Sequence, residues 1–574
     1  MSTKPIIYQL IPRLFANTCP NCVPNGTIEQ NGAGKMNDIS PKALKSIRDL
    51  GATHVWYTGV IEHAHCTDYS KHGIRPDCPY VVKGKAGSPY AIKDYYDIDP
   101  DIAVDVDKRM DEFERLVKRS HKAGLKVIID FVPNHVARRY NSDAKPSGIE
   151  DFGAGDNPEM FFSPFNNFYY ITRQQFSPPF YIGSGDDAYV EFPAKASGND
   201  CYTAFPGEND WYETVKLNYG VDPANGSKHF DPIPPTWMKM LHILRYWASK
   251  GVDGFRCDMA HMVPLEFWHW AISNVKEKYP DIIFIAEIYD VRLYADFIKT
   301  GGFDYLYDKV NLYDSLRDIE CHNHSSATLT SCWQTVEGLS DHMLNFLENH
   351  DEQRFASVQY AGDASKVIPS LVVSSMMSTG PFMLYMGQEL GEPGADAEGF
   401  SGRDGRTTIF DYWSVSTIRR WFDCGECDTR LLTASEIALR EDYKKILNLC
   451  NEEKAISEGK FFDVMYVNYN NHRFSPHRHY AFLRATDDEA LIIAVNFDHD
   501  RASEVAINIP AHAFEFLNLP EGELEMTELL SGQTSKKTLD RDTPFTTYIP
   551  APLNAVIWKV KIQPAKSTKQ KSNS

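Results

Sequence analysis

Eight short apolar runs, rich in β-branched and aromatic residues, recur along the chain, and segments of helical periodicity follow them. Such alternation is typical of a parallel sheet covered by helices. Eight is also the number of strands that closes a TIM barrel. We therefore predict an α/β fold, a (β/α)8 TIM barrel. Its predicted strands are residues 5–12, 53–60, 125–132, 251–258, 282–289, 303–308, 343–350 and 381–388.

The chain has 574 residues, which exceeds the ~250–300 residues at which a single core stops growing. About eighty residues separate Val136 from the helix predicted at 235–250, too many for a structureless loop, so an inserted subdomain is predicted after the third strand. Beyond a long helix around 435–452, period-two alternation predicts a C-terminal antiparallel β-sandwich domain. The predicted units are the barrel, the insert, the C-terminal domain and a disordered tail, at residues 1–136 with 219–455, 137–218, 456–562 and 563–574.

Charge and composition argue against several classes of protein. A formal net charge of −19 repels polyanions, because nucleic-acid binding depends on Lys and Arg. No apolar stretch approaches the ~18–20 residues that cross a bilayer, and the opening residues do not resemble a signal peptide. Eleven cysteines, an odd number scattered from Cys19 to Cys450, suit a reducing compartment. We expect a cytoplasmic protein that binds a neutral substrate, with no membrane or nucleic-acid partner; the sequence does not indicate its oligomeric state.

Three carboxylates lie at the ends of predicted strands, where TIM barrels carry their catalytic groups. Asp258, Glu287 and Asp351 lie at or just after the fourth, fifth and seventh strands, so they would converge over one pocket. Cleavage of a glycosidic bond requires two carboxyl groups, one ionised to attack the anomeric carbon and one holding a proton for the leaving oxygen.

The surroundings of two of these carboxylates suggest different roles for them. Arg256 lies two positions before Asp258, on the same strand face, and would keep that carboxylate charged. Glu287 follows the apolar residues 282–286 and would be partly desolvated, which raises the pKa of a carboxylic acid and suits it to proton donation.

Four segments at these strand ends resemble the four signature regions of the α-amylase family of glycoside hydrolases. The similarity runs from Ile7 to about Lys559. The segments are Asp130-Phe131-Val132-Pro133-Asn134-His135, Gly254-Phe255-Arg256-Cys257-Asp258, Ala286-Glu287 and Glu348-Asn349-His350-Asp351.

The resemblance implies roles for six residues. Asp258 is expected to be the nucleophile, Glu287 the general acid/base and Asp351 the stabiliser of the transition state. The residues expected to bind the sugar at the cleavage site are His135, Arg256 and His350.

Two further segments are similar to stretches of the same family. In residues 88–95, Tyr90 matches a tyrosine that stacks under the sugar, and Asp94 would lie near Arg256 if the family geometry applies. Residues 216–218, Lys-Leu-Asn, resemble the fifth motif found in neopullulanase and cyclomaltodextrinase relatives.

Two positions bear on specificity and on metal binding. The position three after the nucleophile is often lysine in amylases, where it contacts the leaving-group side; here it is His261, which we include among the substrate-binding residues. Asn134 matches a family residue that can ligate calcium between barrel and insert, but no carboxylate-rich oxygen cage is recognisable beside it. We therefore expect no required cofactor and leave calcium at Asn134 as an open alternative.

The resulting expectation is a retaining α-glucan hydrolase that cleaves α-1,4-glucosidic bonds of starch-derived oligosaccharides through a covalent glycosyl-Asp258 intermediate. Two alternatives stay open. The first is a glucanotransferase or trehalose-forming isomerase of the same family. The second is a non-catalytic sugar-binding or transporter-associated relative, because a fold alone does not establish activity.

Overall fold

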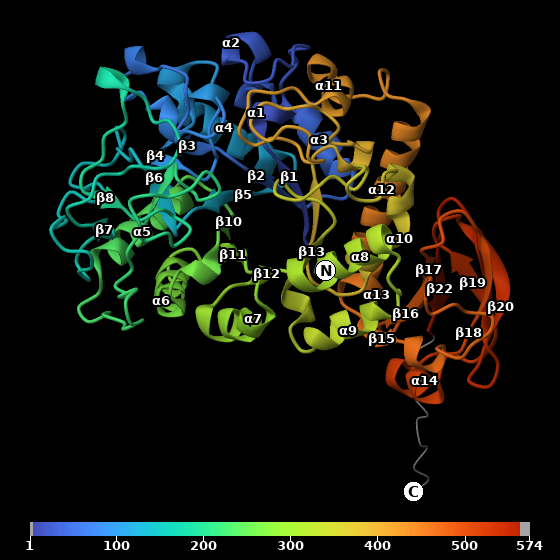
Figure 1. The fold of residues 1–574 in the computed structure, drawn as a ribbon. Coiled ribbons are helices and arrows are strands. Elements are labelled where there is room, and N and C mark those ends of the chain that lie inside the picture. Colours follow the sequence, from blue (N-terminus) through green and yellow to red (C-terminus); the bar gives the residue numbers. More distant parts are fainter. Residues whose placement is uncertain (1–3, 563–574) are drawn as a thin grey trace, which may run out of the picture.

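The computed structural model describes residues 4–562, and in it the eight predicted strands close a barrel (Figure 1). Every strand pairs in parallel with its neighbours, and the order around the barrel follows the chain. The predicted TIM barrel is confirmed. Its strands are β1 (Ile6–Leu10), β2 (His54–Tyr57), β5 (Lys126–Phe131), β10 (Gly254–Cys257), β11 (Ile283–Ala286), β12 (Tyr305–Tyr307), β13 (Met343–Phe346) and β14 (Phe382–Tyr385).

Helices surround the barrel, and their ends carry the expected residues. The hydroxyl of Ser40 accepts a hydrogen bond from the amide of Ala43, and Pro41 takes the first helical position of α3. Gly51 follows α3 with φ near 103°, a conformation that favours glycine. The longer helices are α3 (Pro41–Asp49), α4 (Arg109–Lys122), α5 (Pro235–Ser249), α6 (Leu265–Lys276), α8 (Asp314–His322), α10 (Val367–Met376) and α12 (Ala434–Glu452).

Two antiparallel ribbons extend the loops after β2 and β5. Strands β3 (Ile61–His63) and β4 (Ile92–Ile98) form the first ribbon. Strands β6 (His135–Ala137) and β9 (Thr214–Lys216) form the second, and between them the chain makes the predicted insert. The insert also contains the short pair β7 (Tyr170–Ile171) and β8 (Ala194–Lys195).

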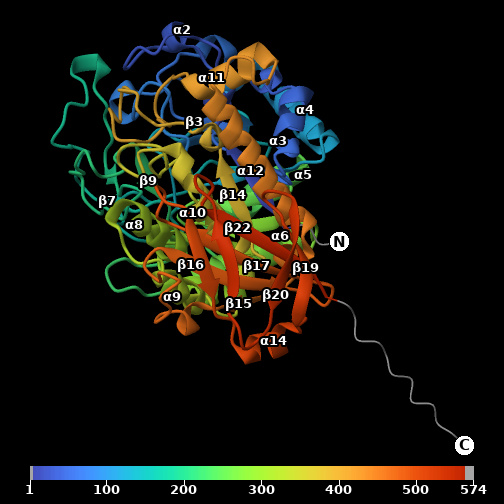
Figure 2. The ribbon, with the colours of Figure 1, turned by 90° about the vertical axis from the view of Figure 1, so that its right-hand side faces the viewer.

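The C-terminal part is an antiparallel β domain, as predicted, and it packs on one side of the barrel (Figure 2). Arg484 on β16 is buried and donates hydrogen bonds to the carbonyls of Ala455, Ile456 and Met377, which join the sheet to the helical layer. The predicted tail 563–574 lies outside the described residues. The strands are β15 (Lys460–Asp463), β16 (His479–Ala485), β17 (Glu489–Asn496), β18 (Ser503–Ile507), β19 (Gly522–Glu528), β20 (Gln533–Leu539), β21 (Phe545–Ile549) and β22 (Ala555–Lys561).

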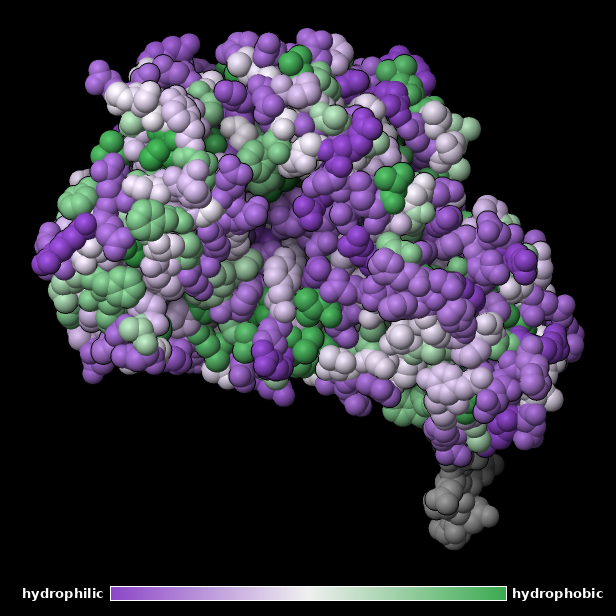
Figure 3. All heavy atoms as spheres, in the orientation of Figure 1, coloured by the Kyte–Doolittle hydropathy of each residue, from purple (hydrophilic) through white to green (hydrophobic). Residues whose placement is uncertain are grey.

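The surface drawn in Figure 3 is mainly hydrophilic and is hollowed near its middle. Hydrophobic residues occur on it in small groups between polar ones. Within residues 4–562, none of the helices has the length and apolar character needed to cross a membrane.

Candidate active site

The ends of the barrel strands bring the three predicted carboxylates to one cavity of about 330 Å³. Cys257 of β10 pairs with Ala286 of β11, so the next residues along each strand, Asp258 and Glu287, lie side by side at the rim. Asp351 follows β13 and lines the same cavity. Parallel strands thus bring together carboxylates that are 29 or more residues apart in the chain. The register of the strand pairing places Asp258 and Glu287 at the same level along the barrel axis.

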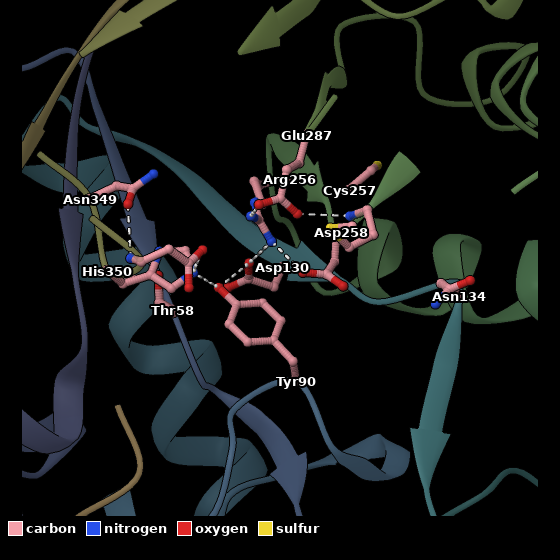
Figure 4. Close-up of polar contacts among 12 residues, drawn as sticks. Thr58, Tyr90, Asp130, Asn134, Arg256, Cys257, Asp258, Glu287, Asn349 and His350 are labelled. Carbon is pink, nitrogen blue, oxygen red and sulfur yellow. Dashed lines mark hydrogen bonds and ion pairs between the residues drawn. The ribbon is translucent and has the colours of Figure 1, made fainter. Parts of the chain in front are cut away.

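Arg256 connects the acidic groups of this cavity (Figure 4). It is fully buried; its Nη1 lies 2.8 Å from Asp258 Oδ1 and its Nη2 lies 2.6 Å from Glu287 Oε1. The same guanidinium lies 3.6 Å from Asp130 Oδ1, because Arg256 and Asp130 are paired in register on β10 and β5. Its Nε also donates to the hydroxyl of Tyr307, at 3.2 Å. One cation therefore contacts both members of the predicted catalytic pair.

Asp258 is held in a strongly desolvating environment. Burial, followed by the charge of Glu287, raises the pKa of Asp258 well above its ordinary value, and Arg256 offsets only part of the rise. Arg256 lowers the pKa of Asp258 and so favours its charged form, while burial and the charge of Glu287 act in the opposite direction. The charged state of Asp258 in the working enzyme stays a prediction.

Asp351 is in the opposite situation, because it is about half exposed and faces a histidine. Desolvation is the largest single influence on Asp351 and acts to raise its pKa. The charge and hydrogen bond of His350, with Nε2 at 3.1 Å from Oδ2, act together with the charges of Arg256 and Arg406 in the opposite direction, and the pKa falls to about 2. The lowered pKa favours an ionised Asp351 at neutral pH.

Tyr90 lines the cavity, and the buried His350, which is not among the lining residues, lies against it. Their rings stack with centroids 5.2 Å apart, and the Tyr90 hydroxyl lies 2.5 Å from His350 Nε2. The other nitrogen of His350, Nδ1, lies 2.7 Å from Gln9 Nε2 on β1. The tyrosine ring is therefore held in one orientation and lines the cavity, while its stacking under a sugar stays a prediction.

His135 also lines the cavity, with its ring 5.2 Å from that of Trp211 in the insert. Burial, with a smaller contribution from Lys216, lowers the pKa of His135 to about 3. The imidazole is therefore neutral and can both donate and accept hydrogen bonds.

Glu287 is fixed by two further donors. The amide of Met259 donates to its Oε2 at 2.8 Å, and the hydroxyl of Tyr289 donates to its Oε1 at 2.5 Å. Met259 has a left-handed backbone, with φ of 42°, directly after Asp258. A non-glycine residue in that conformation is strained, and such strain is common where a backbone group must be aimed at a site.

Two residues, Asp94 and His261, do not lie where the sequence analysis placed them. Asp94 does not serve as a partner of Arg256; its carboxylate accepts hydrogen bonds from Ser142, Ala144 and Tyr96. Asp130 takes the place beside Arg256, because strand register places it there. His261 does not line the cavity of the carboxylates but a neighbouring one, with its ring 6.2 Å from that of Tyr289.

Asn134 does not fit the role of a calcium ligand. It is fully buried, its Oδ1 accepts a hydrogen bond from the ammonium of Lys216, and its Nδ2 donates to the Gly198 carbonyl at 2.8 Å. Lys216 in turn pairs with Asp200 at 2.8 Å. The Lys216 ammonium therefore lies where a metal ion bound to the Asn134 amide oxygen would lie, and the positive charge of the ammonium would repel a divalent cation.

Several residues of this site were not predicted from the sequence, among them Asp130, Tyr289 and Trp211. Asp130 was visible as the first residue of a motif, and its pairing with Arg256 could have been inferred from adjacent parallel strands. Tyr289 lies two residues after Glu287, the spacing that places side chains on one face of an extended chain. Trp211 comes from irregular backbone in the insert, and no sequence signal identifies it.

Comparison with known proteins gives matches to the barrel and to the whole chain. A family model described as "Alpha amylase, catalytic domain" matches residues 9–445. Alpha-amylase 3 of Dictyoglomus thermophilum is 23% identical over 474 residues, which cover 79% of this chain and 78% of that protein. Alpha-amylase MalA of Haloarcula japonica is 24% identical over 392 residues; these cover 68% of this chain but only 44% of that longer relative.

The fold is also similar to solved structures along its full length. The noncanonic maltogenic alpha-amylase AmyB from Thermotoga neapolitana superposes with a TM-score of 0.62 at 18% sequence identity. The match covers 98% of this chain and 99% of that chain. At this level of identity the likeness concerns the fold, and the chemistry has to be argued from the side chains.

Proposed function

The chain belongs to the α-amylase family of glycoside hydrolases, and on this premise we propose that it hydrolyses α-1,4-glucosidic bonds of starch-derived oligosaccharides with retention of configuration. The observation that carries the proposal is the contact of one buried arginine with two adjacent carboxyls, in a cavity that also holds an ionised third. A guanidinium bridging two carboxyls suits the separation of about 5–5.5 Å that retaining glycosidases use.

In the proposed mechanism, Asp258 attacks the anomeric carbon while Glu287 gives its proton to the leaving glycosidic oxygen. This step requires a proton on Glu287 and a negative charge on Asp258, so that Asp258 can act as the nucleophile. The products are the shortened sugar and a glycosyl ester on Asp258. Water, deprotonated by Glu287, then attacks the ester and restores both carboxyls.

The remaining residues act on the sugar and on its developing charge. Asp351, whose pKa is about 2, places a permanent negative charge at the cavity, where it stabilises the oxocarbenium-like transition state. Tyr90 offers its ring as a platform for the sugar, and neutral His135 offers a hydrogen bond to a hydroxyl group.

Maltoheptaose tests the proposal. Chromatography of the products over time and proton NMR of their anomeric configuration should give short maltosaccharides that appear first in the α form. Asp258→Asn should abolish the reaction, whereas Asp290→Asn should leave it near the wild-type rate, because Asp290 lies three residues after Glu287 but outside the cavity.

Other outcomes identify the alternatives. Products longer than maltoheptaose would indicate a transferase, and a β-configured first product would contradict the retaining mechanism. Absence of any reaction with maltoheptaose and related glucosides would contradict the enzymatic proposal and favour a sugar-binding role.

A further inference from the structure

A second group of acidic side chains lies outside the active-site cavity, in the ribbon of β3 and β4 (Figure 1). Glu62 on β3 is paired directly with Asp94 on β4, and the register is irregular on both sides of Glu62. Like charges directly opposite each other destabilise a strand pair. Bulges of this kind redirect side chains and are common next to functional sites.

The three carboxylates of this ribbon, Glu62, Asp94 and Asp97, form a compact buried group. Glu62 and Asp94 are fully buried, and Asp97 is 3% exposed. One oxygen from each of the three lies within 4.8 Å of the others. Two oxygens on opposite sides of one Ca²⁺ are at most about 4.6–5.2 Å apart, because each is about 2.3–2.6 Å from the ion, so these three oxygens are close enough to share one ion.

The hydrogen-bonding capacity of Glu62 is not used by the protein. Its Oε2 has neither a hydrogen-bond nor an ion-pair partner in residues 4–562, and its Oε1 has only Lys93 Nζ, at 3.5 Å. The Lys93 ammonium is itself bound elsewhere, because it donates to the Arg75 carbonyl and pairs with Asp77 at 3.2 Å. A carboxylate that is fully buried and lacks donors is costly to maintain.

Nearby cations do not balance the charge of this group. Glu62, Asp77, Asp94 and Asp97 are four carboxyls, and the cations paired with them are Lys93 and Arg109. The group therefore requires either a proton on Glu62 or a further cation.

We propose that Glu62, Asp94 and Asp97 form a binding site for one hard divalent cation, Ca²⁺ or Mg²⁺. All three ligands are carboxylate oxygens, the donor type that these ions prefer. The ion fills the place left by the unused oxygens of Glu62 and neutralises the excess negative charge. This site is separate from the junction at Asn134, where Lys216 provides the positive charge.

The proposed ion lies where it would connect the ribbon of β3 and β4 to the insert beside the active-site cavity. Asp94 accepts hydrogen bonds from the Ser142 hydroxyl at 2.6 Å and the Ala144 amide at 3.0 Å, both in the first residues of the insert. Tyr90, which lines the cavity, lies two residues before β4. The ion therefore joins the ribbon that carries Tyr90 to the base of the insert.

Calorimetric titration of the full chain, stripped of metal with a chelator, tests the site. CaCl₂ and MgCl₂ are titrated in separate experiments, and bound metal is counted by elemental analysis after gel filtration. We expect one ion per chain, a higher unfolding temperature on saturation, and tighter binding of Ca²⁺ if the site admits its larger coordination shell.

Glu62→Gln, which keeps the shape of the side chain and removes its charge, should weaken binding at least tenfold. Asp200→Asn, which changes the partner of Lys216 at the Asn134 junction, is the matched control and should bind as the wild type does. If Glu62→Gln does not fold, terbium luminescence of the wild type, sensitised by Tyr95 and Tyr96 and displaced by Ca²⁺, provides the readout.

Two results would overturn the inference. One is the absence of binding of either ion, or of terbium, at millimolar concentrations, which would mean that Glu62 holds a proton instead. The other is unchanged affinity in Glu62→Gln, or loss of binding in Asp200→Asn alone, which would place the ion elsewhere.

Discussion

Replacement of Arg256 by methionine should destabilise the protein, and the loss should depend on pH. Arg256 is fully buried and contacts the carboxyls of Asp258, Glu287 and Asp130. Removal of one partner from a buried ion pair leaves an uncompensated charge and costs about 3–5 kcal/mol. Arg256→Met removes the positive charge at similar volume, so packing should contribute little to the change.

The pH dependence follows from Asp130. Burial raises the pKa of Asp130 from 3.8 to about 6, although Arg256 opposes the rise. A rise of about two units corresponds to about 3 kcal/mol. Because the folded-state pKa is above the unfolded value, the contribution of Asp130 to stability is present below pH 4 and is lost as pH rises to about 6.

Without Arg256 the pKa values of Asp130 and Asp258 rise further, because Arg256 lowers both. The cost of Arg256→Met should therefore be largest at pH 7–8 and clearly smaller at pH 5, where the carboxyls can take up protons. Urea unfolding followed by tryptophan fluorescence at pH 7 and pH 5 measures the difference. Arg256→Lys, which keeps a charge but loses the second contact, is the control. A loss under about 1 kcal/mol at pH 7, or an equal loss at both values, would refute this reasoning.

Three further changes test single contacts of the site. Asp351→Asn should lower kcat by about 10²–10³-fold without moving the acidic limb of the pH–rate profile, since the pKa of Asp351 is about 2; a shifted limb would contradict this. Tyr289→Phe removes a 2.5 Å hydrogen bond to Glu287 and should cost about tenfold in kcat with little change in KM; steady-state kinetics that show a change in KM alone would point to a sugar contact instead. His135→Gln should raise KM and leave the pH profile unchanged between pH 5 and 8, because the pKa of His135 is about 3; a pH profile that changes shape would mean that His135 is protonated in this range.

The barrel could be predicted from sequence because its strands carry their own signal. The strand at 125–132 is mainly apolar and, apart from Lys126, buried, and glycines such as Gly51 mark the helix ends. The carboxylates at the strand ends could be predicted for the same reason: Asp258 and Glu287 each follow a recognisable strand, and parallel pairing brings them together.

Features that depend on distant segments could not be predicted in this way. Asp94 was assigned to Arg256 by motif similarity, whereas strand register gives that place to Asp130. Lys216 is 82 residues from Asn134, and only the folded ribbon of β6 and β9 brings its ammonium to the amide oxygen. The protonation of Asp258 depends on the balance between burial and Arg256, which periodicity does not measure.

Asp258 is proposed to form a covalent bond to the sugar, and trapping of this glycosyl ester identifies the attacking residue. Glu287→Gln incubated with an α-maltosyl fluoride forms the ester without acid assistance, since fluoride leaves unaided, but cannot readily hydrolyse it. Mass spectrometry of the digested protein should find the added sugar on the peptide that contains Asp258, and no such adduct in Asp258→Asn. A sugar attached at another residue, or turnover of the fluoride with inversion and no adduct, would contradict the account.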